Sequence, residues 1–399
     1  MKSILFVDDE TRILDGLKRM LRSLRREWKM TFVDTGAAAL SHLDAEYVDV
    51  VVTDMRMPGM DGSELLQEAR VRYPGTVRII LSGQCDRDSV FQCLGPAHQF
   101  LTKPCDSESL KATVARACKL RDHLPNTWSK RLVSGVQSLP SLPVNHEKLR
   151  AEARSEAPCT KRFAKIVNRD PAMAAKVLQL VNSGFFGTPR RVSDPVQAVN
   201  LLGLDILKPL ILSTDVFLPL SPDNFHHPQF EKLVHRSLLV AQAAKAIAES
   251  ETEDATIIHD AWLGGLAGNV GILMLLETMG DKYVEAMESA CHEELCLAEI
   301  EKRTLNMTHD SVGAYLLGLW GLPDPIVKAV AWHLDPCRDD EKQFGPLTAV
   351  HVANALVEEH PVAPPDPLDM NYLIQIGCED RLDAWRALCR GAVLEGANP

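Results

Sequence analysis

Short apolar runs alternate with amphipathic stretches over the first 122 residues of the chain. The runs are rich in β-branched residues and end in polar residues, which is typical of buried strands. The stretches between them carry apolar residues at helical spacing, as at Ile13, Leu17, Met20 and Leu24. Strands that alternate with helices form parallel sheets through right-handed crossovers. The pattern predicts an α/β domain with a five-stranded parallel sheet, with strands at residues 4–7, 30–33, 48–53, 77–81 and 99–102 and a last helix at 111–121.

The pattern changes after residue 122. Pro125, Pro140 and Pro143, with polar residues between them, indicate a linker or an irregular approach to a second domain. From about Phe163 onward, apolar residues recur at helical spacing without strand-like alternation of comparable length. The rest of the chain is therefore predicted to be all-α. Helices are expected to open at 170–171 and 194–195 and to continue at 230–249, 260–279, 284–303, 311–319, 325–333, 346–359 and 373–394.

Composition narrows the class of protein. With 399 residues, 46% of them hydrophobic, the chain is long enough for about two or three domains. No segment reaches the roughly 18 uninterrupted apolar residues of a membrane span, and the first strand begins at Ser3, so neither a membrane protein nor a signal peptide is expected. The ten cysteines form no CxxC pair, which favours a reducing cytoplasm. A net charge of −11 argues against a general nucleic-acid binder, although residues 12–29 carry a basic helix face suited to solvent or to an acidic partner.

Polar side chains that could form one site stand at the ends of the predicted strands. Asp8-Asp9 follows the first strand, and Asp54, Ser82 and Lys103 stand at or just past the ends of three others. The carboxyl ends of parallel strands open onto one crevice, so these groups are expected to meet. A carboxylate cluster needs a cation to offset its repulsion, and Mg²⁺ held by one or two carboxylates and a phosphate is the usual solution. The sequence thus predicts a site that moves a phosphoryl group onto an aspartate.

These residues resemble the receiver domain of two-component response regulators, which has a flavodoxin-like fold, over residues 1–122. The resemblance implies that Asp54 is the phosphoacceptor and that a sensor histidine kinase is the donor. It also implies that Asp9, Asp54 and the backbone carbonyl of Arg56 hold Mg²⁺, with Asp8 assisting through water. Ser82 takes the place of the switch hydroxyl, Phe100 that of the switch aromatic, and Lys103 bridges to the phosphoryl oxygens.

A second set of motifs resembles the HDOD output domain, a relative of the HD phosphohydrolases, over residues 131–360. The resemblance implies a receiver at 1–122, a linker at 123–130, an HD-like helical domain at 131–360 and a C-terminal helical extension at 361–399. The motifs are Leu139-Pro140-Ser141-Leu142-Pro143, Asp170-Pro171-Ala172-Met173, Asn182-Ser183, 198–203, 264–271, 309–323, Trp332-His333 and His351-Val352-Ala353-Asn354.

The metal site of an active HD hydrolase is degenerate in this chain. The resemblance places its His-Asp doublet at Gly268-Asn269, and neither side chain supplies the carboxylate that a divalent metal needs. His235 and Asn354 stand at other family ligand positions, and two partial ligands do not make a hydrolytic site. A literal His259-Asp260 has the wrong offset and is interpreted as a helix start. The other candidates, His309, His333 and the Cys291-His292 and Cys296 group, are interpreted as structural.

The expected function is a cytoplasmic response regulator in which phosphorylation of Asp54 controls a non-catalytic helical binding module, with no metal in that module. Its expected partners are the histidine kinase, a downstream signalling protein and, as a possibility, a second copy of the chain. One alternative is a metal-dependent phosphodiesterase that acts on a cyclic dinucleotide, which Gly268-Asn269 opposes. Another is direct transcriptional control, which the absence of a recognisable basic helix-turn-helix pattern opposes.

Overall fold

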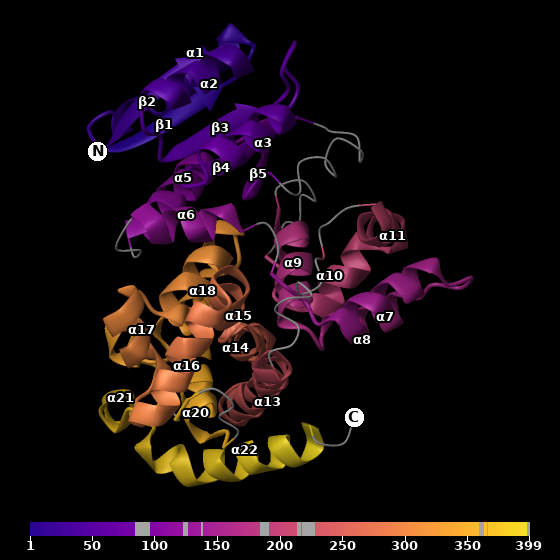
Figure 1. The fold of residues 1–399 in the computed structure, drawn as a ribbon, viewed down its shortest axis with the longest axis vertical. Coiled ribbons are helices and arrows are strands. Elements are labelled where there is room, and N and C mark those ends of the chain that lie inside the picture. The colour runs from indigo at the N-terminus through magenta and orange to yellow at the C-terminus, as the bar shows by residue number, and fades with distance from the viewer. Residues whose placement is uncertain are drawn as a thin grey trace.

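The computed structural model describes residues 1–83, 96–122, 127–136, 139–183, 191–213, 217, 228–358, 363–364 and 366–396. The first part is an α/β domain, drawn in indigo and violet at the top of Figure 1. Its parallel sheet has the order β2-β1-β3-β4-β5, the flavodoxin-like order, as predicted. The strands are β1 (Lys2–Val7), β2 (Trp28–Val33), β3 (Val50–Asp54), β4 (Val77–Ser82) and β5 (Gln99–Thr102).

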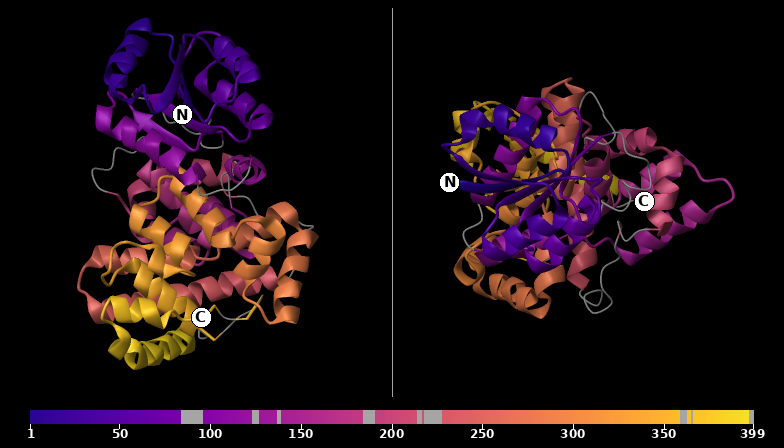
Figure 2. Two further views of the ribbon diagram at one scale, coloured as in Figure 1. Left: turned by 90° about the vertical axis from the view of Figure 1, so that its left-hand side faces the viewer. Right: turned by 90° about the horizontal axis from the view of Figure 1, so that it is seen from above.

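The sheet is buried because helices cover both of its faces (Figure 2). Every residue of β3 and β4 is buried, so these strands read as continuous apolar runs with little alternation. Register aligns the strand ends: Val7 lies opposite Thr53, and Asp54 opposite Leu81. The helical elements described in this domain are α1 (Thr11–Met20), η1 (Arg22–Leu24), α2 (Gly36–Ala45), α3 (Gly62–Arg72) and α5 (Ser107–Asp122).

The second part is built of helices, as predicted. Its first half contains α6 (Thr127–Gly135), α7 (Pro143–Arg154), α8 (Thr160–Val167), α9 (Pro171–Asn182), α10 (Pro195–Leu202) and α11 (Leu204–Ser213). The middle contains α13 (Pro228–Glu251), α14 (Ala255–Ala267), α15 (Val270–Met279), α16 (Asp281–Glu293) and α17 (Leu297–Leu305). The last elements are α18 (His309–Leu319), α19 (Asp324–Trp332), η3 (Pro336–Arg338), α20 (Pro346–Leu356), α21 (Met370–Gln375), η4 (Glu379–Arg381) and α22 (Leu382–Gly396).

Several helices differ in extent from their sequence patterns. The pattern at 260–279 is two helices, because the chain breaks at Gly268 and Asn269 between α14 and α15. The pattern at 284–303 is also two helices, because Glu294 takes a left-handed conformation after α16. Helix α6 begins inside the segment predicted as a linker, whose residues 123–126 lie outside the described ones. Residue 359, the predicted end of the helix at 346–359, also lies outside the described residues.

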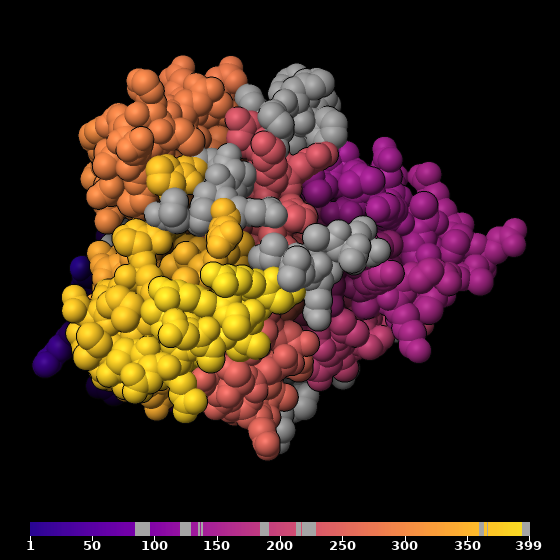
Figure 3. All heavy atoms as spheres, turned by 90° about the horizontal axis from the view of Figure 1, so that it is seen from below, coloured from indigo at the N-terminus to yellow at the C-terminus, as the bar shows by residue number. Residues whose placement is uncertain are grey.

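The C-terminal helix is part of the helical core. In Figure 1, α22 runs beneath α13 and α20, and in Figure 3 its yellow atoms cover that end of the molecule. Trp385 is fully buried, and its Nε1 donates to Glu251 Oε1 at 3.1 Å. Residues 370–396, predicted as an extension, therefore complete the packing of α13.

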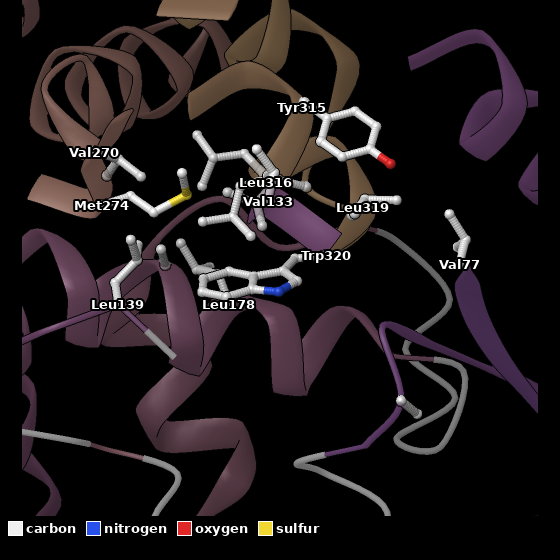
Figure 4. Packing of buried hydrophobic residues seen from close by; sticks show 14 of the residues in the cluster. Val77, Val133, Leu139, Leu178, Val270, Met274, Tyr315, Leu316, Leu319 and Trp320 are labelled. Carbon is white, nitrogen blue, oxygen red and sulfur yellow. The ribbon is translucent and has the colours of Figure 1, made fainter. Parts of the chain in front are cut away.

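One hydrophobic cluster runs from the sheet into the helical part without interruption, from Ile4 of β1 to Val330 of α19. Residues of α6, α9, α15 and α18 meet in it, including Val133, Leu178, Met274 and Leu316 (Figure 4). The two parts are thus docked against each other through a shared core.

One stretch in the described part of the chain, Ala255–Met279, has the length and composition of a membrane span, and the bent pair Pro195–Leu202 and Leu204–Leu212 is a second candidate. In the first, 78% of the apolar window is buried inside the helical part, which is typical of the core helix of a globular protein.

Candidate functional site

The carboxyl edge of the sheet brings together the polar groups that the sequence placed there. Asp8 directly follows β1, Asp54 is the last residue of β3, and Lys103 follows β5. The Lys103 ammonium lies between the two carboxylates: its Nζ is 2.6 Å from Asp8 Oδ2 and also donates to Asp54 Oδ1. Asp8 and Asp54 are 2% and 8% exposed, so these ion pairs are shielded from water.

Electrostatics keeps this lysine charged. Burial alone would lower the pKa of Lys103, but the hydrogen bonds and charges of Asp54 and Asp8 outweigh burial and raise that pKa. The ammonium in turn offsets the repulsion between two carboxylates that point at the same spot. The ammonium therefore neutralises one of the two carboxylate charges and leaves the pair with a net negative charge.

Local backbone structure fixes the direction of Asp54. Its Oδ2 accepts the backbone N–H of Arg56 at 2.7 Å, which leaves Oδ1 facing Lys103. Behind it, Gly62 opens α3, and a Cβ at that position would lie 2.0 Å from the Asp54 carbonyl oxygen. Only glycine permits this approach. A capping box formed by Asp61 and Glu64 then holds the start of α3 against the site.

The other predicted receiver residues surround this centre. Asp9 is exposed beside Asp8, and the Arg56 side chain points to solvent. Ser82 ends β4 and is 9% exposed, and its Oγ donates to the Gly83 carbonyl at 3.3 Å. Phe100 is 8% exposed and packs in the hydrophobic core.

The donor set suits a hard cation. Carboxylates of Asp9 and Asp54 and a backbone carbonyl are the oxygen ligands that Mg²⁺ prefers. Within the described ranges, no group of three or more His, Cys, Asp or Glu side chains is arranged to hold a metal. Two carboxylates and a carbonyl fit an ion that keeps several waters and completes its shell with a phosphoryl oxygen, which is how Mg²⁺ is usually bound.

A second polar site lies in the helical part, around the position of the degenerate HD centre. A cavity of about 30 Å³ is lined by buried polar side chains together with apolar ones. The polar residues are Arg236, Asn269, His309, His333, Asn354 and Asp366. Asn269 donates from Nδ2 to Ser237 Oγ at 3.1 Å, and Asn354 donates from Nδ2 to Asp366 Oδ2 at 3.1 Å. A cavity of this size holds about one or two waters.

Two residues expected at this centre do not line the cavity. His235 is exposed on α13, and its neighbour Arg236 lines the cavity in its place, because successive helical residues point about 100° apart. Gly268 ends α14 without contributing to the lining, and His259 and Asp260 lie earlier on that helix, also outside the lining. Burial raises the pKa of Asp260 to about 6.

Glu301 was missed by sequence reasoning although it organises this centre. It is fully buried, accepts the Tyr283 hydroxyl through Oε1, and meets both His309 Nδ1 (2.8 Å) and the His309 backbone N–H (2.9 Å) through Oε2. Burial alone would lower the pKa of His309, but the charge and hydrogen bond of Glu301 raise it to about 9. Burial and the His309 charge lower the pKa of His333 to about 4. Nothing in the sequence pattern separates Glu301 from the other charged residues of α17.

Comparison with protein families matches residues 4–115 to the response regulator receiver domain and residues 139–336 to the HDOD domain. The hydrogenase transcriptional regulatory protein HoxA of Cupriavidus necator is 37% identical over 117 residues, which are 29% of this chain and 24% of that protein. The sensory transduction protein RegX3 of Mycobacterium tuberculosis is 31% identical over 114 residues, 29% of this chain and 49% of that protein. The chain thus spans about a quarter to a half of the length of these curated relatives.

Among solved structures, the MmoQ response regulator from Methylococcus capsulatus is 23% identical and covers 63% of this chain and 98% of its own, with a TM-score of 0.45. The receiver domain of an HD domain-containing protein from Pseudomonas fluorescens is 30% identical and covers 30% of this chain and 97% of its own, with a TM-score of 0.29.

The sheet order, the strand-end residues and the family matches define a response regulator receiver domain followed by a helical domain of the HDOD family. The chain belongs to the two-component response regulators that join these two domains.

Proposed function

We propose that this response regulator is a phosphorylation-controlled switch, in which Asp54 accepts a phosphoryl group from a sensor histidine kinase and the HDOD domain responds. The observation that carries the proposal is the Lys103 ammonium between Asp8 and Asp54 at the carboxyl ends of the strands. A bridging cation of this kind holds the acceptor carboxylate in place before transfer. It can then follow the negative charge onto the phosphoryl group.

The chemistry is a displacement at phosphorus. A carboxylate oxygen of Asp54 forms a bond to phosphorus as the bond between phosphorus and the donor nitrogen breaks, and the nitrogen keeps that electron pair. Arg56 N–H holds the other carboxylate oxygen, which orients the attack. The product carries close to two negative charges and three acceptor oxygens. Lys103 and the Ser82 hydroxyl are the neighbouring donors that can meet these oxygens.

Magnesium fits the exposed side of this pocket. Asp9 and Asp54, with the backbone carbonyl of Arg56, are the residues that would hold it, with Asp8 acting through water. When bound, the ion neutralises negative charge on the phosphoryl group. The Lys103 ion pair keeps Asp8 inside the pocket, while Asp9 faces solvent, which supports this division of roles.

We propose that the HDOD domain is a binding module without catalytic activity. Arg236 brings a permanent cation into the cavity where a hydrolase of the HD type would need anionic and imidazole ligands. Its guanidinium is already bound to Asn354, so the cavity is lined by an internal polar network. The downstream partner would then be a signalling protein bound on the surface of this domain, and the cytoplasm would be the site of action.

Intact-mass measurement with acetyl phosphate and Mg²⁺ tests the switch. The wild-type chain should gain one phosphoryl group, Asp54→Asn should gain none, and Asp9→Ala should lose nearly all uptake because the metal is lost. Glu108→Gln, which alters only a surface pair with Lys111, serves as the control. Uptake by Asp54→Asn at the wild-type rate would refute the assignment.

A further inference from the structure

The receiver face formed by the starts of β4 and β5 and by α5 is covered by helices of the HDOD domain (Figures 1 and 2). Gln99 Nε2 donates to the Gly318 carbonyl at 3.3 Å, and Gln179 Nε2 donates to the His98 carbonyl at 3.3 Å. Arg116 of α5 forms an ion pair with Asp324 at 2.7 Å and also donates to the Leu322 carbonyl. The contact therefore lies at the end of the sheet opposite the phosphorylation site.

Arg78 is the centre of this contact. It is fully buried, and its guanidinium donates to the carbonyls of Pro96 (2.6 Å), Thr76 (3.1 Å) and Ser134 (2.9 Å). Among the described residues no carboxylate is paired with it, and burial lowers its pKa to about 9. The carbonyl oxygens are what stabilise this buried cation. If one of them is lost while the guanidinium stays buried, the folded state loses free energy of stabilisation. The environment of Arg78 is satisfied only when α6 is in place, because Ser134 belongs to α6.

His98 ties the same centre to β5. Its Nδ1 accepts the Arg78 backbone N–H at 3.0 Å, so the ring proton is on Nε2, which lies 2.9 Å from the Ser134 carbonyl. The Ser134 carbonyl thus accepts hydrogen bonds from both the His98 imidazole and the Arg78 guanidinium. On the other side, the Ser134 hydroxyl is 3.0 Å from the Tyr315 hydroxyl of α18. In Figure 4, Val133 and Tyr315 lie in the apolar cluster beside this contact.

We propose that Arg78, His98, Ser134 and Tyr315 form an interdomain latch, which is closed in the unphosphorylated chain and loosened by phosphorylation. The inference rests on the proposed function, since phosphorylation is the signal that the latch receives. Beyond that function, it names α6 as the element that passes the signal to α18.

Strand β5 is the mechanical connection between the two ends. Lys103 follows its last residue and His98 precedes its first, so these two residues are about 16–17 Å apart along the strand at roughly 3.3 Å per residue. Movement of Lys103 toward the phosphoryl group shifts the strand along its pairing with β4, and His98 leaves the Ser134 carbonyl. The Arg78 backbone N–H then loses its acceptor, His98 Nδ1, and the latched state as a whole is disfavoured.

Two variants and a control test the latch in the full chain. Tyr315→Phe removes one hydroxyl and keeps the buried ring, while Arg78→Met removes the guanidinium and keeps an apolar stem. Arg19→Met is the control, because Arg19 is exposed on α1, on another face of the receiver. Hydrogen exchange is measured with and without acetyl phosphate and Mg²⁺, with phosphoryl uptake followed by intact mass. If Arg78→Met does not fold, Tyr315→Phe decides alone.

Phosphorylation should raise exchange in α6 and α18 of the wild type and of Arg19→Met by about fivefold or more. Tyr315→Phe should exchange faster in these helices before phosphorylation and respond less to it. Normal uptake with a wild-type exchange response in both latch variants would overturn the latch and leave the proposed function standing. No uptake by the wild type would overturn both.

Discussion

The Arg236 guanidinium forms two hydrogen bonds with Asn354: Nη1 donates to Oδ1 at 2.8 Å, and Nη2 donates to the backbone carbonyl at 2.9 Å. Both residues are 5% exposed, so the pair is buried. It joins α13 to α20 beside the cavity where a related hydrolase would hold metal. A fixed cation at this point repels a divalent ion and satisfies the neighbouring amide without one.

This pair predicts the absence of hydrolytic activity. Purified protein supplied with Mn²⁺, Mg²⁺ or Fe²⁺ should not turn over cyclic dinucleotides, because the fixed Arg236 charge disfavours the divalent metal on which water would be activated. Chromatographic analysis of the nucleotides after long incubation checks this. Turnover that disappeared in His309→Ala or His333→Ala would instead locate a hydrolytic centre in the cavity.

Lys103→Met should separate phosphorylation from its effect. Asp54 remains available as the nucleophile, so uptake from acetyl phosphate should continue at a reduced rate. The contact that moves with the phosphoryl group is lost, so exchange in the HDOD domain should no longer change on phosphorylation. Lys111→Met, on the surface of α5, is the matched control. A full exchange response in phosphorylated Lys103→Met would contradict the role given to the ammonium.

Gly62→Ala should damage the phosphorylation site through the backbone. The new Cβ would need space now held by the Asp54 carbonyl oxygen, and overpacking of this kind costs about 1–3 kcal/mol. Both the free energy of unfolding and the rate of phosphoryl uptake should fall. Gly16→Ala in α1 has no heavy atom within 4 Å of the new Cβ and should instead add about 0.5–1 kcal/mol of stability. Equal unfolding midpoints for the two variants in urea would exclude this explanation.

Stability should depend on pH through His309. Its folded pKa of about 9 lies above the ordinary value of 6.5, so its stabilising contribution is fully present below pH 6.5 and is lost as pH rises through 9. The contribution is on the order of 3 kcal/mol. Lys176, whose pKa burial lowers to about 7, gives the opposite slope. The measurable quantity is therefore the difference in unfolding free energy between wild type and His309→Gln, which should shrink from pH 6.5 to 9 in urea titrations. A difference that stayed constant over this pH range would show that Glu301 does not raise the pKa of His309 in the folded protein.

The receiver centre was predictable because strand ends in a parallel sheet bring sequence-distant residues to one edge. Asp8, Asp54 and Lys103 needed only that rule to be placed together. The helical domain was harder because helix faces depend on tertiary packing. His235 and Arg236 are neighbours on α13, and a small difference in the predicted rotation of that helix decides which of them faces the cavity. The break between α14 and α15 at Gly268-Asn269 lies inside an apolar run that is continuous in the sequence. Glu301 and Arg78 are charged residues whose burial no local pattern indicates.

The continuous core has a consequence for how such proteins are assembled and altered. Arg78 of β4 and His98, just before β5, supply side chains that contact the Ser134 carbonyl of α6, beyond the residues matched to the receiver family. A receiver transplanted from another regulator would present an unmatched face to α6 and α18. A chimaera that takes β4, β5, α6 and α18 from one parent should therefore keep this contact, and one that exchanges the receiver alone should lose it.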